Sequence, residues 1–108
     1  MKRRPRVRAL KLAAEVRKRL VETLNQPVEV ILYGSQARGD STQYSDVDLL
    51  IILPVVNEYT RKTVSNITWE VGFEAGKVVS GIPTTAEEMK YYAVLPFYRN
   101  IQKEGIAV

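Results

Sequence analysis

Apolar residues along this chain recur at two spacings, one typical of helices and the other of buried strands. Between residues 6 and 25 they return every three or four positions, with basic residues on the other side, which predicts an amphipathic helix. Residues 28–33 and 46–53 are short runs rich in β-branched and apolar side chains, and we expect both to be strands. The second run is nearly all apolar after its two aspartates, which is typical of a strand buried on both faces. The helix is expected to turn these residues toward the core: Leu10, Ala13, Ala14, Leu20, Val21 and Leu24.

The rest of the chain continues to alternate between helical and strand patterns. The polar residues 36–45 predict a short helical turn followed by a loop. A second long helix is predicted over 57–75, capped by its first residue, an asparagine, and ended by Gly76. Residues 77–83 are expected to form a third strand, and 85–88 have the form of a capping box that opens a short helix. The second long helix is expected to present this apolar stripe: Val64, Ile67, Val71 and Ala75.

A last helix is predicted over 96–103, so the order of elements is αβαβαβα. This alternation favours an α/β fold, with a small mixed β-sheet of about three core strands flanked by helices. The 108 residues contain no repeat or interdomain linker, so we expect residues 1–108 to form a single domain.

The composition excludes several kinds of chemistry. The chain has neither cysteine nor histidine, which rules out disulfides, thiolate or histidine zinc sites, and a Ser-His-Asp triad. Any catalysis must therefore use carboxylates, hydroxyls, backbone amides and cations. No apolar run is long enough to span a bilayer, and the basic start is not followed by the apolar region of a secretory signal. We therefore expect a cytoplasmic protein without membrane contact.

The net charge of +4 is concentrated near the N-terminus. Residues 1–19 carry nine Lys or Arg against one acid, whereas the remainder is net acidic. Such an arm is either the solvated face of a helix or a contact surface for nucleic acid or an acidic partner.

The first strand ends abruptly at Gly34-Ser35, where a short helix is predicted to begin. Glycine allows the backbone to pass close to a ligand. Amides at a helix start and the serine hydroxyl donate hydrogen bonds of the kind that phosphate oxygens accept. Arg38 either adds a charge-assisted contact to phosphate or forms an ion pair with Asp40 or Asp46.

Asp46 and Asp48 are two residues apart at the start of the second strand, so their side chains are expected on one face of the sheet. Two like charges on a buried strand are unfavourable unless something compensates them. Mg²⁺ is the expected compensator, because it binds a few carboxylate oxygens and keeps its other positions for water and substrate phosphates. Together, these features predict a nucleotidyl-transfer site.

Gly34-Ser35, ten intervening residues and then Asp46-x-Asp48 resemble the signature of the DNA polymerase β-like nucleotidyltransferases. The surrounding residues, and the tail over 96–105, look like the small stand-alone branch, the minimal nucleotidyltransferases. The resemblance implies that Gly34 and Ser35 contact the triphosphate of ATP or another NTP. It also implies that Asp46 and Asp48 bind Mg²⁺ at the catalytic centre. Arg38 and Ser45 are further candidates for the nucleotide site.

The same resemblance implies a partner. Members of this branch are often encoded beside a helical HEPN protein, and some silence a HEPN toxin by transferring AMP from ATP to one of its tyrosines. Active relatives usually carry a third carboxylate on the third strand, but residues 77–83 contain no acid, and Ser80 is expected at that place. Glu70 and Glu74, on the preceding helix, are either substitutes for that acid or solvated helix charges.

Three functions remain open on the sequence. The first is a Mg²⁺-dependent adenylyltransferase that modifies a hydroxyl of a HEPN-type partner as an antitoxin. The second is a catalytically weak, nucleotide-binding subunit that neutralises such a partner by contact. The third is a nucleic-acid-binding protein that uses its basic arm. Because so short a chain offers little to grip a base and an acceptor, we also expect a homo-oligomer or a hetero-complex. Trp69 and Phe73 are expected to pack in the core or face a partner rather than stack on a base.

Overall fold

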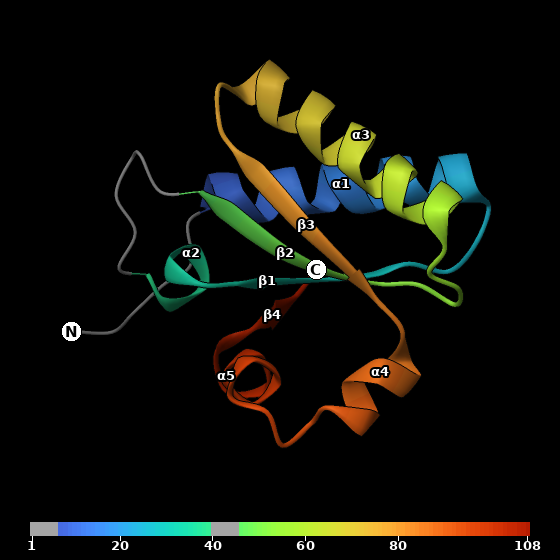
Figure 1. Cartoon of the computed structure of the whole chain (residues 1–108). Coiled ribbons are helices and arrows are strands. Elements are labelled where there is room, and N and C mark those ends of the chain that lie inside the picture. Colours follow the sequence, from blue (N-terminus) through green and yellow to red (C-terminus); the bar gives the residue numbers. More distant parts are fainter. Residues whose placement is uncertain (1–6, 40–45) are drawn as a thin grey trace.

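Helices and strands alternate along residues 7–39 and 46–108, which are the residues described by this computed structural model (Figure 1). The predicted strands and helices are all present, and the chain adds a short C-terminal strand that the sequence pattern did not predict. The elements are α1 (Val7–Leu24), β1 (Glu29–Tyr33), α2 (Ser35–Arg38), β2 (Val47–Ile52), α3 (Glu58–Ala75), β3 (Val79–Thr84), α4 (Ala86–Tyr91), α5 (Pro96–Glu104) and β4 (Ile106–Ala107).

The strands form one mixed sheet in the order β3-β2-β1-β4. β2 runs antiparallel to β1 and parallel to β3, and β4 pairs antiparallel with β1 at the far side. The expected α/β class with a small mixed sheet is therefore confirmed. β3 is an edge strand among the strands that the structure describes.

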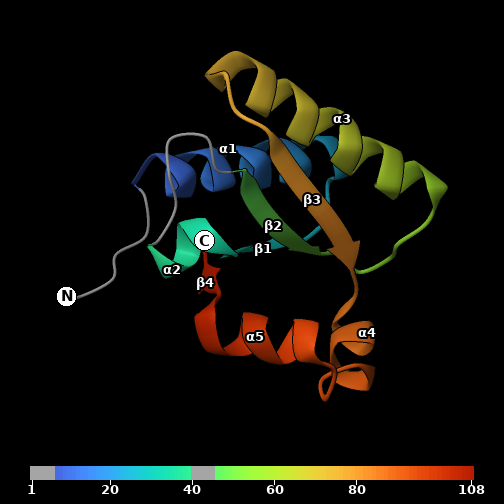
Figure 2. The ribbon, with the colours of Figure 1, turned by 60° about the vertical axis from the view of Figure 1, so that its left-hand side comes forward.

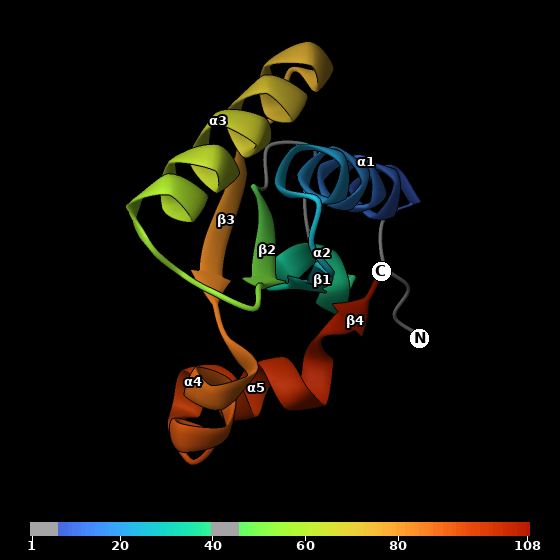
Figure 3. The same ribbon diagram turned by 90° about the vertical axis from the view of Figure 1, so that its right-hand side faces the viewer.

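Helices cover the two faces of the sheet unequally. α1 and α3 lie on one face, whereas the shorter α4 and α5 lie on the other (Figure 3). Successive residues of β2 point to opposite faces, so Val47, Leu49 and Ile51 join the core beneath α1 and α3. On the other face Leu50 is also fully buried, whereas Asp48 is only half-buried. The prediction of a strand buried on both faces is confirmed.

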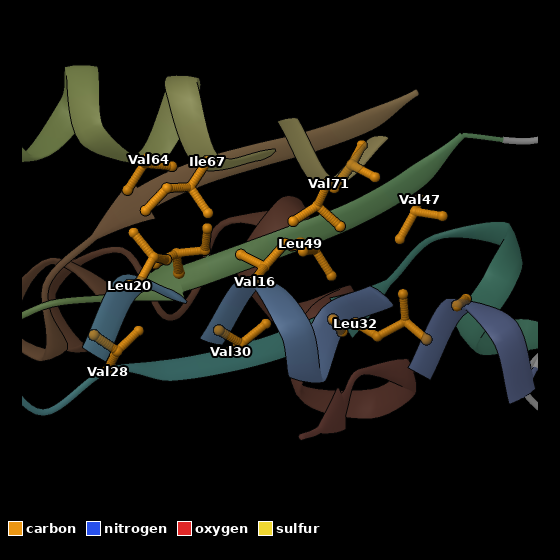
Figure 4. Packing of buried hydrophobic residues seen from close by; sticks show 14 of the residues in the cluster. Val16, Leu20, Val28, Val30, Leu32, Val47, Leu49, Val64, Ile67 and Val71 are labelled. Atoms are coloured by element: carbon orange, nitrogen blue, oxygen red, sulfur yellow. The ribbon is translucent and has the colours of Figure 1, made fainter. Parts of the chain in front are cut away.

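The core lies between α1, α3 and the sheet, with Val16 and Leu20 of α1 facing Val64 and Ile67 of α3 (Figure 4). The predicted core face of α1 was partly wrong, because Ala14 and Val21 are exposed. A spacing of three or four residues shows which side of a helix is apolar, but it does not show which of two adjacent strips on that side is buried. The position of α3 decides this for α1. The buried residues of α1 are Ala9, Ala13, Val16, Leu20 and Leu24.

The predicted helix boundaries have the expected caps. The Asn57 side chain accepts a hydrogen bond from the Thr60 amide at 2.9 Å, and the Thr60 hydroxyl accepts one from the Asn57 amide. Thr85 caps α4 by accepting from the Glu88 amide at 3.0 Å. In a complete capping box the Glu88 carboxylate would accept a hydrogen bond from the Thr85 amide. Here it accepts one from the Thr84 hydroxyl instead.

Three arginines of α1 contact backbone or side-chain groups of the fold. Arg17 donates to the Val28 carbonyl at 2.9 Å, and Arg8 donates to the carbonyl of Ala75 at the end of α3. Arg19 forms ion pairs with Glu15 and Glu74. These contacts favour a structural role for the described part of the basic arm, whose residues 1–6 lie outside the described range. In the ranges described, none of the helices has the length and apolar character that crossing a membrane requires.

Candidate active site

The pairing of β1 with β2 brings the Gly34-Ser35 turn and the aspartate pair together. Tyr33, the last residue of β1, lies opposite Asp48 in the antiparallel register. The turn that follows Tyr33 therefore lies beside the start of β2. Residues that are more than ten positions apart in the sequence become neighbours through this register.

Gly34 is required at this place for two separate reasons. Its φ of 76° and ψ of −157° belong to a region that is essentially restricted to glycine. A Cβ atom built on Gly34 would also stand 2.7 Å from Oδ2 of Asp48. The missing side chain is therefore what allows the Asp48 carboxylate to lie against the backbone of the turn.

Ser35 opens α2 immediately beside this carboxylate. The first hydrogen bonds of α2 run from the amides of Ala37 and Arg38 to the Gly34 carbonyl, both at 3.1 Å. The amide of Ser35 lies ahead of these bonds and has no acceptor within α2 itself. Ser35 is half-buried at the start of α2, and its predicted contact with phosphate stays a prediction.

Asp46 and Asp48 share one electrostatic environment. Asp46 is exposed directly ahead of β2, and Asp48 is half-buried two residues later. Burial raises the pKa of Asp48 above its usual value, the negative charge of Asp46 raises this pKa further, and the Arg38 guanidinium lowers it. Two neighbouring carboxylates in a partly dry site match the donor set that Mg²⁺ uses together with substrate phosphates. The residues present therefore fit a divalent cation.

Arg38 lies between the aspartates and the C-terminal helix. Its guanidinium pairs with the carboxylate of Glu104 at 3.4 Å, and its charge is felt by Asp48. The structure gives Arg38 an ion pair with Glu104, and Asp40 lies outside the described residues, so the predicted pair with Asp40 or Asp46 stays a prediction. The predicted contact of Arg38 with a nucleotide stays a prediction, as does that of Ser45, which also lies outside the described residues.

The third strand places Ser80 where the sequence analysis expected it. Ser80 is the register partner of Asp48 in the parallel β2–β3 ladder, so both side chains point to the same face of the sheet. Within residues 7–39 and 46–108, no third Asp or Glu joins the pair in a metal-binding group. Glu70 and Glu74 do not replace it, because both pair with Arg19 of α1, on the helix that covers the opposite face.

Sequence reasoning missed the contribution of α5 to this region. Tyr33, Gly34, Phe97 and Asn100 line a cavity of about 200 Å³ beside the turn. The Tyr33 ring meets the Phe97 ring edge-on, with centroids 5.5 Å apart. Burial and the charge of Asp48 raise the pKa of Tyr33 to about 12, so its hydroxyl stays protonated at neutral pH. α5 reaches this place because β4 leads from its end back to β1 (Figure 2).

Known proteins resemble this chain in sequence and in fold. A sequence profile that describes the nucleotidyltransferase domain matches residues 13–108. This chain belongs to the nucleotidyltransferase domain family.

Two relatives of this nucleotidyltransferase come from Methanocaldococcus jannaschii, and each carries the name "putative protein adenylyltransferase". The first is 34% identical over 77 residues, which cover 71% of this chain and 73% of the relative. The second is 33% identical over 72 residues, which cover 64% of this chain and 49% of the relative. A bifunctional uridylyltransferase/uridylyl-removing enzyme of Ectopseudomonas mendocina is 30% identical over 80 residues, but this nucleotidyltransferase spans only 9% of its length.

A solved structure supports the same assignment. The crystal structure of a "putative nucleotidyltransferase" from Sulfolobus solfataricus superposes with a TM-score of 0.64 at 26% sequence identity. The match covers 94% of this chain and 79% of the other. The relatives and the shared fold identify a transferase of nucleotidyl groups as the coarse activity of the family.

Replacing Gly34 by Ala is expected to destabilise this nucleotidyltransferase and to weaken the Mg²⁺ and nucleotide binding that the sequence predicts. The added Cβ combines a disfavoured φ with a clash against the Asp48 carboxylate. The Gly76→Ala control is in the left-handed helical region and meets nothing within 4 Å, so it measures the cost of a positive φ without a clash, about 1 kcal/mol. Urea unfolding and calorimetric titration with ATP and Mg²⁺ measure both effects. Equal losses in the two variants would contradict the close contact at Gly34.

Asp48→Asn is expected to stabilise the metal-free protein at neutral pH. Since the pKa of Asp48 is raised on folding, the stability that this group contributes is present at low pH and is lost as the pH rises through the folded pKa. The asparagine variant avoids that loss, and the gain is small because the carboxylate is half exposed to solvent. Urea unfolding with a chelator, at several pH values, should show the gain fading as the pH falls below the usual pKa of aspartate. A gain that is constant with pH would contradict the assignment.

Proposed function

We propose that this chain is a Mg²⁺-dependent nucleotidyltransferase that transfers AMP from ATP to a hydroxyl of a partner protein. The observation that carries the proposal is the contact between Gly34 and the Asp48 carboxylate, since a Cβ at Gly34 would stand 2.7 Å from Oδ2. This contact brings a metal-binding type of side chain against a phosphate-binding type of turn. Membership of the nucleotidyltransferase family and the protein adenylyltransferase names of two relatives support the reaction and its class of acceptor.

Each residue would have a distinct task. Asp46 and Asp48 would hold one Mg²⁺, which when bound neutralises charge on the triphosphate and polarises the α-phosphate. The Ser35 hydroxyl and the amides of the turn would orient the β- and γ-phosphates. Arg38, already beside Asp48, would add positive charge near the same oxygens.

The transfer itself is a displacement at phosphorus. The acceptor oxygen forms a bond to the α-phosphorus, and the bond from that phosphorus to the oxygen bridging to the β-phosphate breaks. Pyrophosphate leaves, and AMP stays on the acceptor. The hydroxyl proton passes to water, because Ser80 stands in the place beside Asp48 where a carboxylate would accept it.

The acceptor that we propose is a helical protein of the HEPN type, with this chain acting as its antitoxin in the cytoplasm. The support is the resemblance to the minimal nucleotidyltransferases. One sheet face carries the site, and α4 and α5 form only a short wall beside it (Figure 3). A hetero-complex, or a homo-oligomer, would supply the other wall.

A second candidate function is favoured by one observation. Ser80 pairs with Asp48 where an acid would complete the metal site. A protein with this site could bind ATP and its partner without efficient turnover, and neutralise the partner by contact alone.

Asp46→Asn with Asp48→Asn is expected to abolish AMP transfer. The pair would lose its charge for Mg²⁺ while keeping its shape. The assay incubates the protein with ATP, Mg²⁺ and the proposed HEPN-type partner, and intact mass reports AMP adducts. Lys62→Gln, an exposed change on α3, is the matched control and should retain activity. Adducts formed at the wild-type rate by the double variant would overturn the site assignment. If no form makes adducts but all bind the partner, the contact function holds instead.

Ser80→Asp is expected to accelerate transfer. The new carboxylate would lie beside Asp48 on the same face and could bind the metal or take the acceptor proton. We expect a rate gain of at least about tenfold, toward the lower end of general-base effects. Asn66→Asp on the exposed surface of α3 adds the same charge elsewhere and should leave the rate unchanged. A single-turnover measurement separates this effect from product release, and an unchanged rate would show that the third acid does not limit the reaction.

A further inference from the structure

A groove runs along the outer edge of β3, between that strand and α3. Its volume is about 730 Å³, and it is lined by Arg61, Trp69 and Phe73 from α3 and by Lys77 to Gly81 from the start of β3. β3 lies at the border of the sheet with α3 alongside it (Figure 1). Ser80 belongs both to this groove and to the face that carries Asp48.

We propose that this groove binds an extended, acidic segment of the acceptor protein as an added strand on the edge of β3. An apolar side chain of the segment would lie on the Trp69–Phe73 pair. The inference rests on the proposed function, because the strand would present the acceptor hydroxyl to the site. Strand addition is a common way for a sheet edge to bind a peptide.

The backbone of β3 has the geometry for an additional strand. The Val78 carbonyl accepts from the Val47 amide and the Thr84 carbonyl accepts from the Leu53 amide, both at 2.9 Å. Along a strand of a parallel ladder, the amide and carbonyl groups of successive residues point alternately toward and away from the neighbouring strand. The groups of Val79 and Gly81 therefore point away from β2. Both residues line the groove. Among the strands that the structure describes, none pairs with this edge.

Two aromatic rings form an apolar wall beside that edge. The Trp69 and Phe73 rings are stacked with centroids 5.1 Å apart and an interplanar angle of 13°. Their exposed fractions are 65% and 72%, which are high for large apolar side chains. Exposed aromatic rings that are held rigid by each other are typical anchors in protein interfaces.

The charges of the groove select an acidic segment over a second copy of this chain. Gly72 approaches Lys77, whereas Val64 and Thr68 approach Gly81, so α3 and β3 run in opposite directions. Arg61 and Lys77 therefore lie toward opposite ends of the groove. Two copies joined by antiparallel β3 edges would bring Arg61 of one toward Lys77 of the other, and like charges repel. Acidic residues at both ends of a bound segment would instead be attracted.

An added strand would also lead into the proposed active site. A residue of the segment level with Ser80 would point to the same face as Ser80 and Asp48. It would lie two strand spacings, about 10 Å, from Asp48. A long side chain that ends in a hydroxyl could cross that distance over Ser80, which is small.

The test uses fluorescence of Trp69, because this is the only tryptophan of the chain. The probe is the blocked peptide Asp-Glu-Leu-Tyr-Leu-Glu, and its comparison is Lys-Lys-Leu-Tyr-Leu-Lys, both titrated without ATP. We expect the acidic peptide to change the fluorescence and to bind at least about tenfold more tightly than the basic one. Amide hydrogen exchange measured by NMR should slow at Val79 and Gly81.

A set of protein variants and a pair of modified peptides distinguish strand addition from non-specific binding. Phe73→Ser and Arg61→Glu should each weaken binding of the acidic peptide by about tenfold. Tyr59→Ser and Lys62→Glu, exposed positions of α3 outside the groove, are the matched controls and should change nothing. Two peptides that are N-methylated on opposite sets of alternate residues should differ in affinity. In only one of them do the methyl groups remove the amide donors that face β3.

Each outcome decides one question. Binding that is the same for Asp48→Asn supports the groove even if AMP transfer to the peptide tyrosine fails, in which case the proposed function fails alone. Unchanged fluorescence with both peptides at millimolar concentration would overturn the groove proposal. Equal binding of the two N-methylated peptides would also overturn it. The same holds if sedimentation shows a dimer of this chain that the Phe73→Ser substitution dissociates.

Discussion

The close approach between the Gly34 backbone and the Asp48 carboxylate is the constraint on which the rest of the site depends. It fixes the end of β1 against the start of β2, because a residue with any side chain at Gly34 would push Oδ2 of Asp48 away. The register Tyr33–Asp48 then sets the position of α2, and the neighbouring register Asp48–Ser80 sets that of β3. Three segments that are distant in the sequence are thereby aligned on one face of the sheet.

Two features that oppose stability meet at this place. Gly34 has a backbone conformation restricted to glycine, and Asp48 is a half-buried carboxylate with a raised pKa beside a second acid. At the start of α3, by contrast, the local pattern agrees with the fold, because reciprocal hydrogen bonds cap the helix. Natural proteins tend to depart from local consistency at functional sites. This concentration therefore supports a ligand-binding role independently of any relative.

The sequence predicted most of the elements and the motif, but not what their packing adds. The periodicity of apolar residues and the capping residues were sufficient to predict the long helices and the first three strands, since these signals are local. β4 has only two residues, and its pairing with Ile31 and Leu32 depends on where α5 ends in space. The cavity lined by Phe97 and Asn100 could not be predicted for the same reason. Trp69 and Phe73 were expected in the core or at a partner surface, and their exposure favours the second alternative.

The division of β2 between two faces separates stability from chemistry. Leu49 and Ile51 hold the core beneath α1 and α3, whereas Asp48 serves the other face. Ser80 is exposed on that second face, so a carboxylate or a hydroxyl at this position leaves the core packing untouched. The same fold can therefore carry a complete or an incomplete set of acids. Family membership establishes the scaffold, whereas the balance between the two proposed functions, AMP transfer and neutralisation by contact, would depend on the few side chains beside Asp48 and on what a partner places next to them.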